Sequence, residues 1–501
     1  MSDLAIWDAG PPPPAPARFN IARYALGQGP EDRVALEIIA HPDAPPERWR
    51  VGALGAAIGG TMTGLAARGV APGDRVLLSV GHSVDFPILF LAAAGMGAVP
   101  IPLSTQLTAG EVARISALAG ARLRIGSPAL PGEAVDLPTA RGWRELAPAP
   151  FADTCADAPA YMVFTSGTGG APKGVLHAHR AAWARRMMWA DWYGLKPGDR
   201  VLHAGAFNWT FTLGTGLIDP WAAGATALIY TGPGDRRVWS EIARRHGPTH
   251  FAAVPGIFRQ ILDADTAKGE AFATVRSALT AGEALPPGLA ARWQAATGRP
   301  LLSALGMSEV STYVSDRPDG QRALAQHGRR IAILDDATDR PVTRGVAGRL
   351  AVSARDPGLM LGYWRGDGPV LPLSGDWFLT GDRAIMAADG SVTWVGRSDS
   401  LLNAQGYRVA PEEVEAVLLS HPSVADALVV DLPVRADLTI LAAFVTPTED
   451  VPVAELKSHC AQHLAAYKCP REIRFRSALP RNARGKRDRK ALVQTEGWSP
   501  P

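Results

Sequence analysis

A loop rich in hydroxyl groups and glycine, followed by a lysine, is the strongest chemical feature of the sequence. It runs from Thr165 to Lys173, reads TSGTGGAPK, and follows the apolar run YMVF directly. Glycine lets backbone N–H groups approach an anion closely, hydroxyls add donors, and lysine adds a positive charge. A strand that runs into such a loop predicts a phosphate site, with a plain glycine-rich turn as the less favoured alternative.

Two common phosphate loops do not fit this segment. A Walker A loop needs Gly before its lysine and Ser or Thr after it, whereas this lysine lies between Pro172 and Gly174. A dinucleotide fingerprint that begins at Gly167 needs Gly or Ala at position 172, which is proline. The loop therefore indicates neither a P-loop NTPase nor a Rossmann dehydrogenase.

Six further motifs follow this loop: AGEALP at 281–286, LGMSE at 305–309, DWFLTGD at 376–382, GRSD at 396–399, GYRVAPEEVE at 406–415 and LPRNARGK at 479–486. In this order, and over nearly the whole chain, they resemble the adenylate-forming superfamily of acyl- and aryl-CoA synthetases, peptide-synthetase adenylation domains and luciferases. The segment at 207–225 is most similar to benzoate-CoA ligase-like and medium-chain acyl-CoA synthetases.

The resemblance implies an ATP-dependent carboxylic acid:CoA ligase. The acid is activated as an acyl-adenylate with loss of diphosphate, and the acyl group then passes to coenzyme A with release of AMP. Mg²⁺ accompanies ATP, and CoA is the cosubstrate. One alternative is a carrier-protein-loading adenylation enzyme, although no carrier domain is recognisable. Another is a catalytically weakened nucleotide-binding homologue, suggested by Gly169 in place of a hydroxyl residue.

Three residues are the candidates for catalysis. Lys173 suits the β- and γ-phosphates, and Glu309 suits Mg²⁺, which uses few protein carboxylates. The resemblance places Lys486 at the α-phosphate and the attacking carboxylate, and Asp382 and Arg397 at the ribose. Some of these residues also have a purely structural alternative. Glu309 could be a surface acid, Asp382 a turn-capping residue, and Lys486 a solvated lysine within the basic run 481–490. The expected nucleotide-binding set is Thr165, Ser166, Gly167, Thr168, Gly169, Gly170, Lys173, Gly282, Glu283, Gly306, Met307, Ser308, Glu309, Asp382, Arg397 and Lys486.

The expected acyl pocket is uncharged. No charged residue lies between Ala204 and Ile218, which favours an apolar aromatic or short- to medium-chain monocarboxylic acid. By resemblance, Asp399 is the hinge of a C-terminal domain that takes two orientations, and Gly406 and Tyr407 line the CoA channel. The expected pocket residues are Phe207, Asn208, Trp209, Leu213, Val254, Gly256, Ala281 and Leu305, the last in place of the common aromatic.

The elements that must position these residues alternate between short apolar runs and helical patterns. Runs at 75–80, 99–103, 201–203, 225–230, 250–254 and 275–280 predict buried strands of an α/β fold. Residues 325–395 predict a small β-rich subdomain. We expect a loose N-terminal arm at 1–30, a large AMP-binding domain at 31–398, and a small, mobile α+β lid domain at 399–501.

Composition excludes several classes of protein. The chain has 501 residues, 47% hydrophobic and 20% charged, and a net charge of +3, which gives no sign of nucleic acid or an anionic membrane as partner. Three cysteines without a CxxC motif favour reduced thiols in the cytoplasm over a disulfide framework or a zinc site. The N-terminus lacks the pattern of a signal peptide, and no apolar stretch is long enough to span a membrane. The oligomeric state stays open, a homodimer included.

Overall fold

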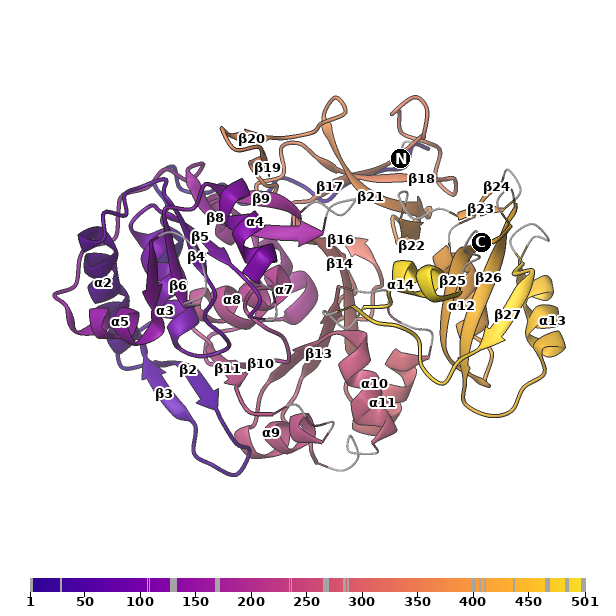
Figure 1. The fold of residues 1–501 in the computed structure, drawn as a ribbon, viewed down its shortest axis with the longest axis horizontal. Helices are drawn as coiled ribbons and strands as arrows, with labels where there is room; N and C mark the ends of the chain where they lie inside the picture. The colour runs from indigo at the N-terminus through magenta and orange to yellow at the C-terminus, as the bar shows by residue number, and fades with distance from the viewer. Residues whose placement is uncertain are drawn as a thin grey trace.

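The computed structural model describes residues 3–496 except 28, 106, 108, 127–132, 167–171, 234, 236, 265–269, 283–284, 286–287, 398–401, 405–406, 410, 436–437, 465–468 and 483–485. Figure 1 shows a large domain, coloured indigo to orange, beside a small C-terminal domain in yellow.

The central sheet of the large domain carries the ends of several predicted site motifs. Its strands are β2 (Val34–Ile39), β3 (Glu47–Arg50), β10 (Arg200–His203), β11 (Thr226–Tyr230), β12 (His250–Ala253), β13 (Ser277–Ala281), β14 (Leu301–Met307), β15 (Ser311–Ser315) and β16 (Leu324–Ala325). They lie in the order β16-β15-β14-β13-β12-β10-β11-β2-β3. The strands from β14 to β2 are parallel, as the predicted α/β class requires.

Helices cover both faces of this sheet. Those on one face are α9 (Val238–His246), α10 (Pro255–Asp263) and α11 (Leu289–Thr297), and those on the other are η2 (Trp189–Tyr193), α7 (Thr210–Leu213), η3 (Gly214–Ile218) and α8 (Asp219–Ala222). Phe251 and Ala253 of β12 pack with the first group, whereas Ala252 packs on the opposite face. The alternation follows from the two-residue period of a strand, and it explains why these strands are apolar along their whole length.

Two smaller sheets form the N-terminal side of the large domain. One contains β4 (Arg75–Leu78), β5 (Val99–Pro102), β6 (Leu123–Gly126) and β7 (Ala134–Asp136), and the other contains β8 (Pro159–Ser166), β9 (Pro172–Ala178), β19 (Gly362–Trp364) and β20 (Pro369–Val370). Leu77 and Val99 of the first sheet pack against Met162 and Leu176 of the second. The helices on this side are α2 (Val51–Ala67), α3 (Asp85–Gly95), α4 (Ala109–Ala119), α5 (Leu137–Gly142), η1 (Trp143–Glu145) and α6 (Arg180–Ala184).

The predicted β-rich subdomain is confirmed. Its antiparallel strands are β17 (Arg330–Leu334), β18 (Ala347–Ser353), β21 (Trp377–Met386) and β22 (Val392–Arg397). At the edge of the same sheet, β1 (Ile6–Asp8) pairs with β17, with Ile6 opposite Ala332.

The expectation of a loose N-terminal arm is wrong for the described residues. Besides β1, the segment forms α1 (Ile21–Leu26), whose residues Ile21 and Ala22 are fully buried. The helix begins at Asn20, whose side-chain oxygen accepts a hydrogen bond from the Ala22 N–H at 3.0 Å. An Asn before the apolar run IARYAL is an N-cap signal that the sequence contained. The proline-rich appearance of the segment concealed it.

The C-terminal domain is the predicted α+β unit. Its elements are β23 (Leu402–Ala404), β24 (Tyr407–Val409), α12 (Pro411–Leu419), β25 (Val424–Arg435), β26 (Leu438–Pro447), α13 (Val453–His463), β27 (Glu472–Phe475) and α14 (Arg489–Glu496). Helices α12 and α13 cover one face of the sheet β25-β26-β27, and α14 covers the other. The predicted boundary at Asp399 lies outside the described residues, between the end of β22 and the start of β23.

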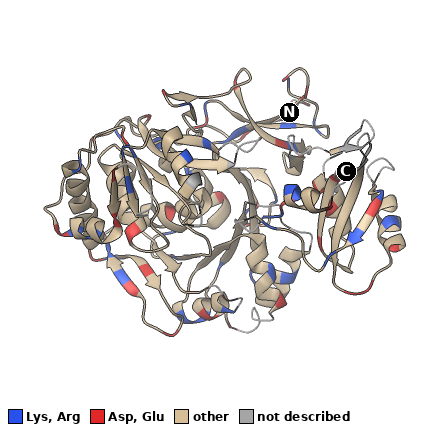
Figure 2. Ribbon diagram, in the orientation of Figure 1, with Lys and Arg blue, Asp and Glu red and all other residues tan. Residues whose placement is uncertain are grey.

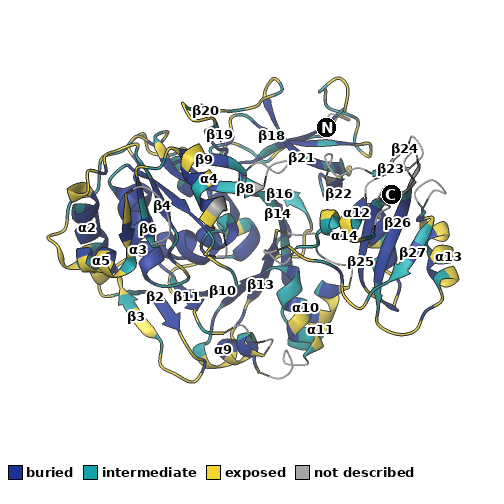
Figure 3. Ribbon diagram, viewed as in Figure 1, coloured by how far each residue is buried: buried dark blue, intermediate teal, exposed yellow. Residues whose placement is uncertain are grey.

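Burial and charge follow this two-domain arrangement. Figure 3 shows buried residues along the strands of both domains and exposed residues on the outer sides of helices such as α11 and α13. Figure 2 shows Lys and Arg interspersed with Asp and Glu over both domains, in agreement with the small net charge of +3. None of the helices among the described residues has the length and hydropathy needed to cross a bilayer.

Candidate active site

The phosphate-loop motif lies at the tip of the antiparallel β8–β9 hairpin. Thr165 is opposite Lys173 and Ser166 is opposite Pro172, so the two ends of the loop are joined by strand pairing. The sequence predicted the strand before the loop but not the strand after it. The loop tip itself, 167–171, lies outside the described residues.

Lys173 and Glu309 both contact Tyr363. The Tyr363 hydroxyl donates a hydrogen bond to Glu309 Oε1 at 2.8 Å, and Lys173 Nζ lies 5.3 Å from the centroid of the same ring. Glu309 is only 8% exposed, so the alternative of a plain surface acid does not describe it. Sequence reasoning missed Tyr363, because its partners are distant in the chain and an aromatic residue in a short strand is usually core.

The turn that carries Glu309 is held from several sides. The Met360 N–H donates to the Glu309 carbonyl at 2.8 Å, and His177 Nε2 donates to the Ser308 carbonyl at 2.7 Å. Burial lowers the pKa of His177 from 6.5 to about 4, so its ring is neutral near pH 7. A Cβ at Gly306 would lie 2.7 Å from the Ser311 carbonyl oxygen, so the turn requires glycine there. The motif is therefore a rigid support for the Glu309 carboxylate.

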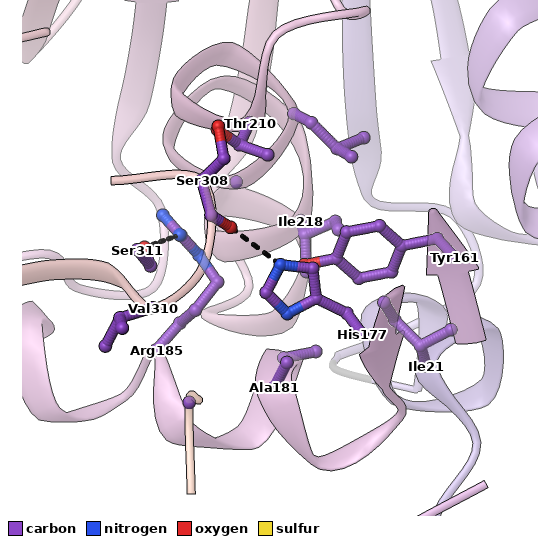
Figure 4. A pocket seen from close by; sticks show the side chains of 14 residues that line it. Ile21, Tyr161, His177, Ala181, Arg185, Thr210, Ile218, Ser308, Val310 and Ser311 are labelled. Carbon is purple, nitrogen blue, oxygen red and sulfur yellow. Dashed lines mark hydrogen bonds between the residues drawn. The ribbon is translucent and has the colours of Figure 1, made fainter. Parts of the chain in front are cut away.

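A cavity of about 20 Å³ lies between this turn and the predicted acyl segment (Figure 4). Thr210, Leu213 and Ser308 line it together with Tyr161 and His177, whose rings stack at 4.8 Å. A space of this size holds about one water molecule and is too small for an aromatic ring.

A buried guanidinium also lines this cavity, and sequence reasoning missed it. Arg185 lies outside the segment 204–218 and pairs with Asp219 through bonds of 2.7 Å and 2.6 Å. Arg185 also donates to Ser311 Oγ (Figure 4). A Cβ at Gly214 would overlap the guanidinium carbon, so glycine makes room for the ion pair. Because Asp219 neutralises Arg185, this wall carries no net charge.

Asp382, the predicted ribose ligand, is held by two aromatic donors. The Trp394 indole N–H donates to Oδ1 at 3.1 Å and the Tyr313 hydroxyl donates to Oδ2 at 3.3 Å. The residue is 4% exposed, and it lies opposite Arg397 across the β21–β22 pair. The structure thus brings the two predicted ribose residues to neighbouring strands. The side chain of Arg397 lies outside the described residues.

Lys486 reaches the large domain from the C-terminal domain. Its Nζ donates to the Gly282 carbonyl at 2.9 Å and lies 5.8 Å from the centroid of the Trp209 ring. The backbone N–H of Asn482 donates to the Lys486 carbonyl at 2.8 Å, and the Lys486 N–H donates to Asn482 Oδ1 at 3.1 Å, which closes the loop. The predicted adenine-side and catalytic-lysine motifs therefore meet across the domain interface.

The basic neighbours of Lys486 behave differently. Arg481 and Arg487 both pair with Asp426, at 2.7 Å and 2.8 Å, and Arg489 pairs with Glu415 at 2.7 Å. These acids belong to the C-terminal domain itself. In contrast to these arginines, Lys486 points across to the large domain, which argues against a uniformly solvated basic run.

The expected acyl residues are spread over several elements of the large domain. Trp209 packs closely against Gly282, where a Cβ would lie 2.9 Å from the indole ring, and it joins one apolar cluster with Ala281. Phe207 is 2% exposed and stacks on Phe86 at 5.1 Å. The remaining expected residues lie on β14, α7 and the start of α10, and they are Leu305, Leu213, Val254 and Gly256. Asn208 lies half-buried beside Trp209.

Several predicted site residues lie outside the described part of the chain, and for three others only the backbone is described. Their roles stay predictions: Gly167, Thr168, Gly169, Gly170, Glu283, Asp399 and Gly406, with the side chains of Ser166, Arg397 and Tyr407.

Comparison with known proteins agrees with this arrangement. The AMP-binding enzyme family model matches residues 28–364, and the AMP-binding enzyme C-terminal domain matches residues 413–486. The benzoate–CoA ligase of Thauera aromatica is 30% identical over 97% of this chain and 98% of its own length.

Solved structures give the same result. A benzoate CoA ligase from Burkholderia xenovorans LB400 superposes with a TM-score of 0.84 at 27% identity, covering 95% of this chain and 100% of the other. The anthranilate CoA ligase AuaEII, in complex with anthranoyl-AMP, superposes with a TM-score of 0.84 at 26% identity, covering 96% and 98%. With the motifs in order, both domains matched and Lys486 at their interface, this chain belongs to the AMP-binding enzyme family of adenylate-forming ligases.

Proposed function

We propose that this chain is an AMP-forming acid:CoA ligase whose acid is an aromatic monocarboxylic acid. The observation that carries the proposal is the approach of the Lys486 ammonium to Gly282 and Trp209, which places a positive charge between the predicted nucleotide and acyl motifs. The relatives named above act on benzoate and anthranilate by their names, and they support the aromatic class.

The first half-reaction joins two anions. The carboxylate oxygen of the acid attacks the α-phosphorus of ATP, the new O–P bond forms, and the bond to the β-phosphate oxygen breaks to release diphosphate. Lys486 neutralises charge at the α-phosphate and the attacking carboxylate, and Lys173 neutralises charge on the leaving diphosphate. Both lysines act as fixed positive charges, and neither needs to transfer a proton.

Residues of the chain fit a Mg²⁺ ion that arrives with the nucleotide. Mg²⁺ keeps several waters and takes one or two protein carboxylates beside substrate phosphates. Glu309 supplies one nearly buried carboxylate near the ring that contacts Lys173. The described residues contain no group of three or more His, Cys, Asp or Glu that makes a complete protein cage. When bound, Mg²⁺ would neutralise phosphate oxygens, and Glu309 would hold it.

Asp382 orients the nucleotide in this proposal. A carboxylate accepts hydrogen bonds from both hydroxyls of a ribose, and the donors Trp394 and Tyr313 fix its rotamer before the nucleotide arrives. Arg397, opposite Asp382 on the neighbouring strand, would assist there. Preorganisation of this kind keeps the α-phosphate in line with the attacking oxygen.

The second half-reaction needs a different arrangement of the domains. The CoA thiol attacks the acyl carbonyl of the adenylate, the thioester forms and AMP leaves. We propose that the C-terminal domain turns about Asp399, which withdraws Lys486 and brings Gly406 and Tyr407 toward the pantetheine arm. Such gating is common where an intermediate must be protected and then released.

The acyl site is proposed to be apolar and neutral. Trp209 and Ala281 supply aromatic and aliphatic surface, and Asp219 cancels the buried cation Arg185 near the acyl segment. A second carboxylate on the substrate would find no counter-charge in this neutral wall, and an ammonium would find none either. The cavity lined by Thr210 and Leu213 of α7 holds about one water, so an aryl group could enter there only if α7 moved.

A panel of acids tests the proposal. Benzoate, hydroxybenzoates, octanoate, malonate and an amino acid are assayed for acid-dependent exchange of diphosphate into ATP, and then for thioester and AMP formation with CoA. We expect an aromatic monocarboxylate to give the highest kcat/KM and free CoA to accept the acyl group. Highest activity with malonate or the amino acid contradicts the substrate class. Exchange without transfer to CoA contradicts the ligase.

The proposal includes a cytoplasmic location, where ATP and CoA are both available. The homodimer stays a prediction that size-exclusion chromatography with light scattering would check.

A further inference from the structure

Strand β19 holds Tyr363 beside the phosphate hairpin. It pairs with β9, the strand that carries Lys173, with Tyr363 opposite Val175. Just before β19, the Leu361 N–H donates to the Leu176 carbonyl at 2.7 Å. A Cβ at Gly362 would lie 2.6 Å from the backbone of Val370, so the strand is locked between β9 and β20. The position of Tyr363 is therefore fixed by backbone pairing on both sides.

The same short segment also holds the Glu309 turn. Met360 donates its N–H to the Glu309 carbonyl, and the Tyr363 hydroxyl donates to the Glu309 carboxylate. One short stretch of chain thus contacts both the main chain and the side chain of Glu309. Its aromatic ring meets the Lys173 ammonium, which an aromatic face attracts through its quadrupole.

These contacts give the Tyr363 side chain two separate functions, one for its hydroxyl and one for its ring. The hydroxyl fixes one carboxylate oxygen and so selects the rotamer in which Glu309 meets a cation. The ring face restrains the long, flexible side chain of Lys173, which otherwise samples many rotamers. Loss of the hydroxyl and loss of the ring should therefore have different consequences.

We propose that Tyr363 is a positioning residue that fixes the Glu309 carboxylate and the Lys173 ammonium relative to each other for Mg²⁺ and the diphosphate end of ATP. The inference rests on the proposed function, in which these two residues hold those groups.

Two substitutions separate the hydroxyl from the ring. Tyr363→Phe keeps the ring, so we expect the Mg²⁺ concentration for half-maximal diphosphate exchange to rise about tenfold, a usual effect of losing a hydrogen bond to a metal-binding carboxylate. ATP binding in EDTA, measured by calorimetry, should stay unchanged. Tyr363→Leu removes both contacts, so ATP binding in EDTA should weaken as well. Thioester formation from supplied acyl-adenylate should match the parent in both variants.

Trp364→Phe is the matched control on the same strand. Trp364 projects to the other face, where its indole N–H donates to the Leu118 carbonyl at 3.1 Å. We expect this variant to bind Mg²⁺ and ATP as the parent does. A Glu309→Gln background gives a second check, because Tyr363→Phe should then cause no further change in the Mg²⁺ requirement.

Several outcomes would overturn the proposal. One is a Tyr363→Phe protein with the parent's Mg²⁺ requirement, and another is an equal loss in both half-reactions with a lowered Tm. A variant that fails to fold would assign Tyr363 to the core instead. If the parent itself shows no acid-dependent exchange, the proposed function fails. The comparison of ATP binding with Mg²⁺ and with EDTA still tests Tyr363 in that case.

Discussion

The two lysines of the site are positioned in different ways. Lys173 lies on β9, and its neighbour Tyr363 belongs to the strand paired with β9 in the same domain. Lys486 comes from the C-terminal domain and reaches Gly282 across the interface. One positive charge is built into the large domain, whereas the other is present only while the C-terminal domain keeps this orientation. In the proposed mechanism both charges act in adenylation, and only the Lys486 charge is withdrawn for thioester formation.

Removal of the Lys486 charge should have the largest effect. We expect Lys486→Ala to slow acyl-adenylate formation by about 10²–10³, the usual cost of losing a group that stabilises transition-state charge. Thioester formation from supplied acyl-adenylate should be largely spared. Rapid-quench measurement of each half-reaction decides this. Lys490→Ala, an exposed lysine of α14, is the control and should match the parent. An equal loss in both half-reactions would count against the assignment.

A substitution at the predicted hinge, Asp399, should instead affect thioester formation. Proline fixes φ at about −65° and removes an N–H, so Asp399→Pro should restrict the C-terminal domain to one orientation. We expect diphosphate exchange to persist and most CoA-dependent turnover to be lost. Asp399→Ala, which keeps the backbone free, should retain both activities. Thioester synthesis by the folded proline variant at the parent rate would make Asp399 an ordinary turn residue and misplace the predicted boundary.

A smaller effect is expected from the support of the Lys486 loop. Asp426 on β25 pairs with Arg481 and Arg487, which lie on either side of the loop. Asp426→Asn should weaken both ion pairs and cost about 2 kcal/mol of C-terminal domain stability. Adenylation should fall less than in Lys486→Ala, because the lysine is retained but held less firmly. Calorimetric unfolding and diphosphate exchange on one preparation measure both effects. Lower stability with unchanged adenylation would show that the loop does not need Asp426.

Local chemistry was readable from the sequence, whereas contacts between distant segments were not. Apolar runs such as 225–230 predicted buried strands, and the loop at 165–173 predicted a phosphate site, because both signals lie within a few consecutive residues. The Tyr363 contacts depend on the packing of three separated segments. The Arg185–Asp219 pair has the same origin, since the segment predicted to be uncharged is closed by two charges from outside it. Pairing of Ile6 with Ala332 is the extreme case.

The last prediction concerns a buried histidine of the large domain. His203, at the end of β10, is 1% exposed, and neither ring nitrogen has a hydrogen-bond partner among the described residues. Burial, aided by the nearby His82 and Arg185, lowers the pKa of His203 from 6.5 to about 3. Below pH 6.5 the unfolded chain binds a proton at this residue that the folded chain does not. His203 therefore reduces stability progressively as the pH falls from 6.5 toward 3, and its protonation has no such effect above that range.

Replacement by an apolar residue of similar size should reverse this. We expect His203→Leu to raise the free energy of unfolding by about 1–3 kcal/mol at about pH 7.5, since two unsatisfied polar atoms leave the core. It should also make stability fall less steeply between about pH 6.5 and pH 4.5. Urea unfolding at several pH values measures both quantities, with the exposed His41→Leu as control. Because buried carboxylates contribute to the slope of every variant, the comparison is the difference from the parent. A His203→Leu protein whose pH slope equals that of the parent would mean that the imidazole is protonated in the folded chain as readily as in the unfolded one.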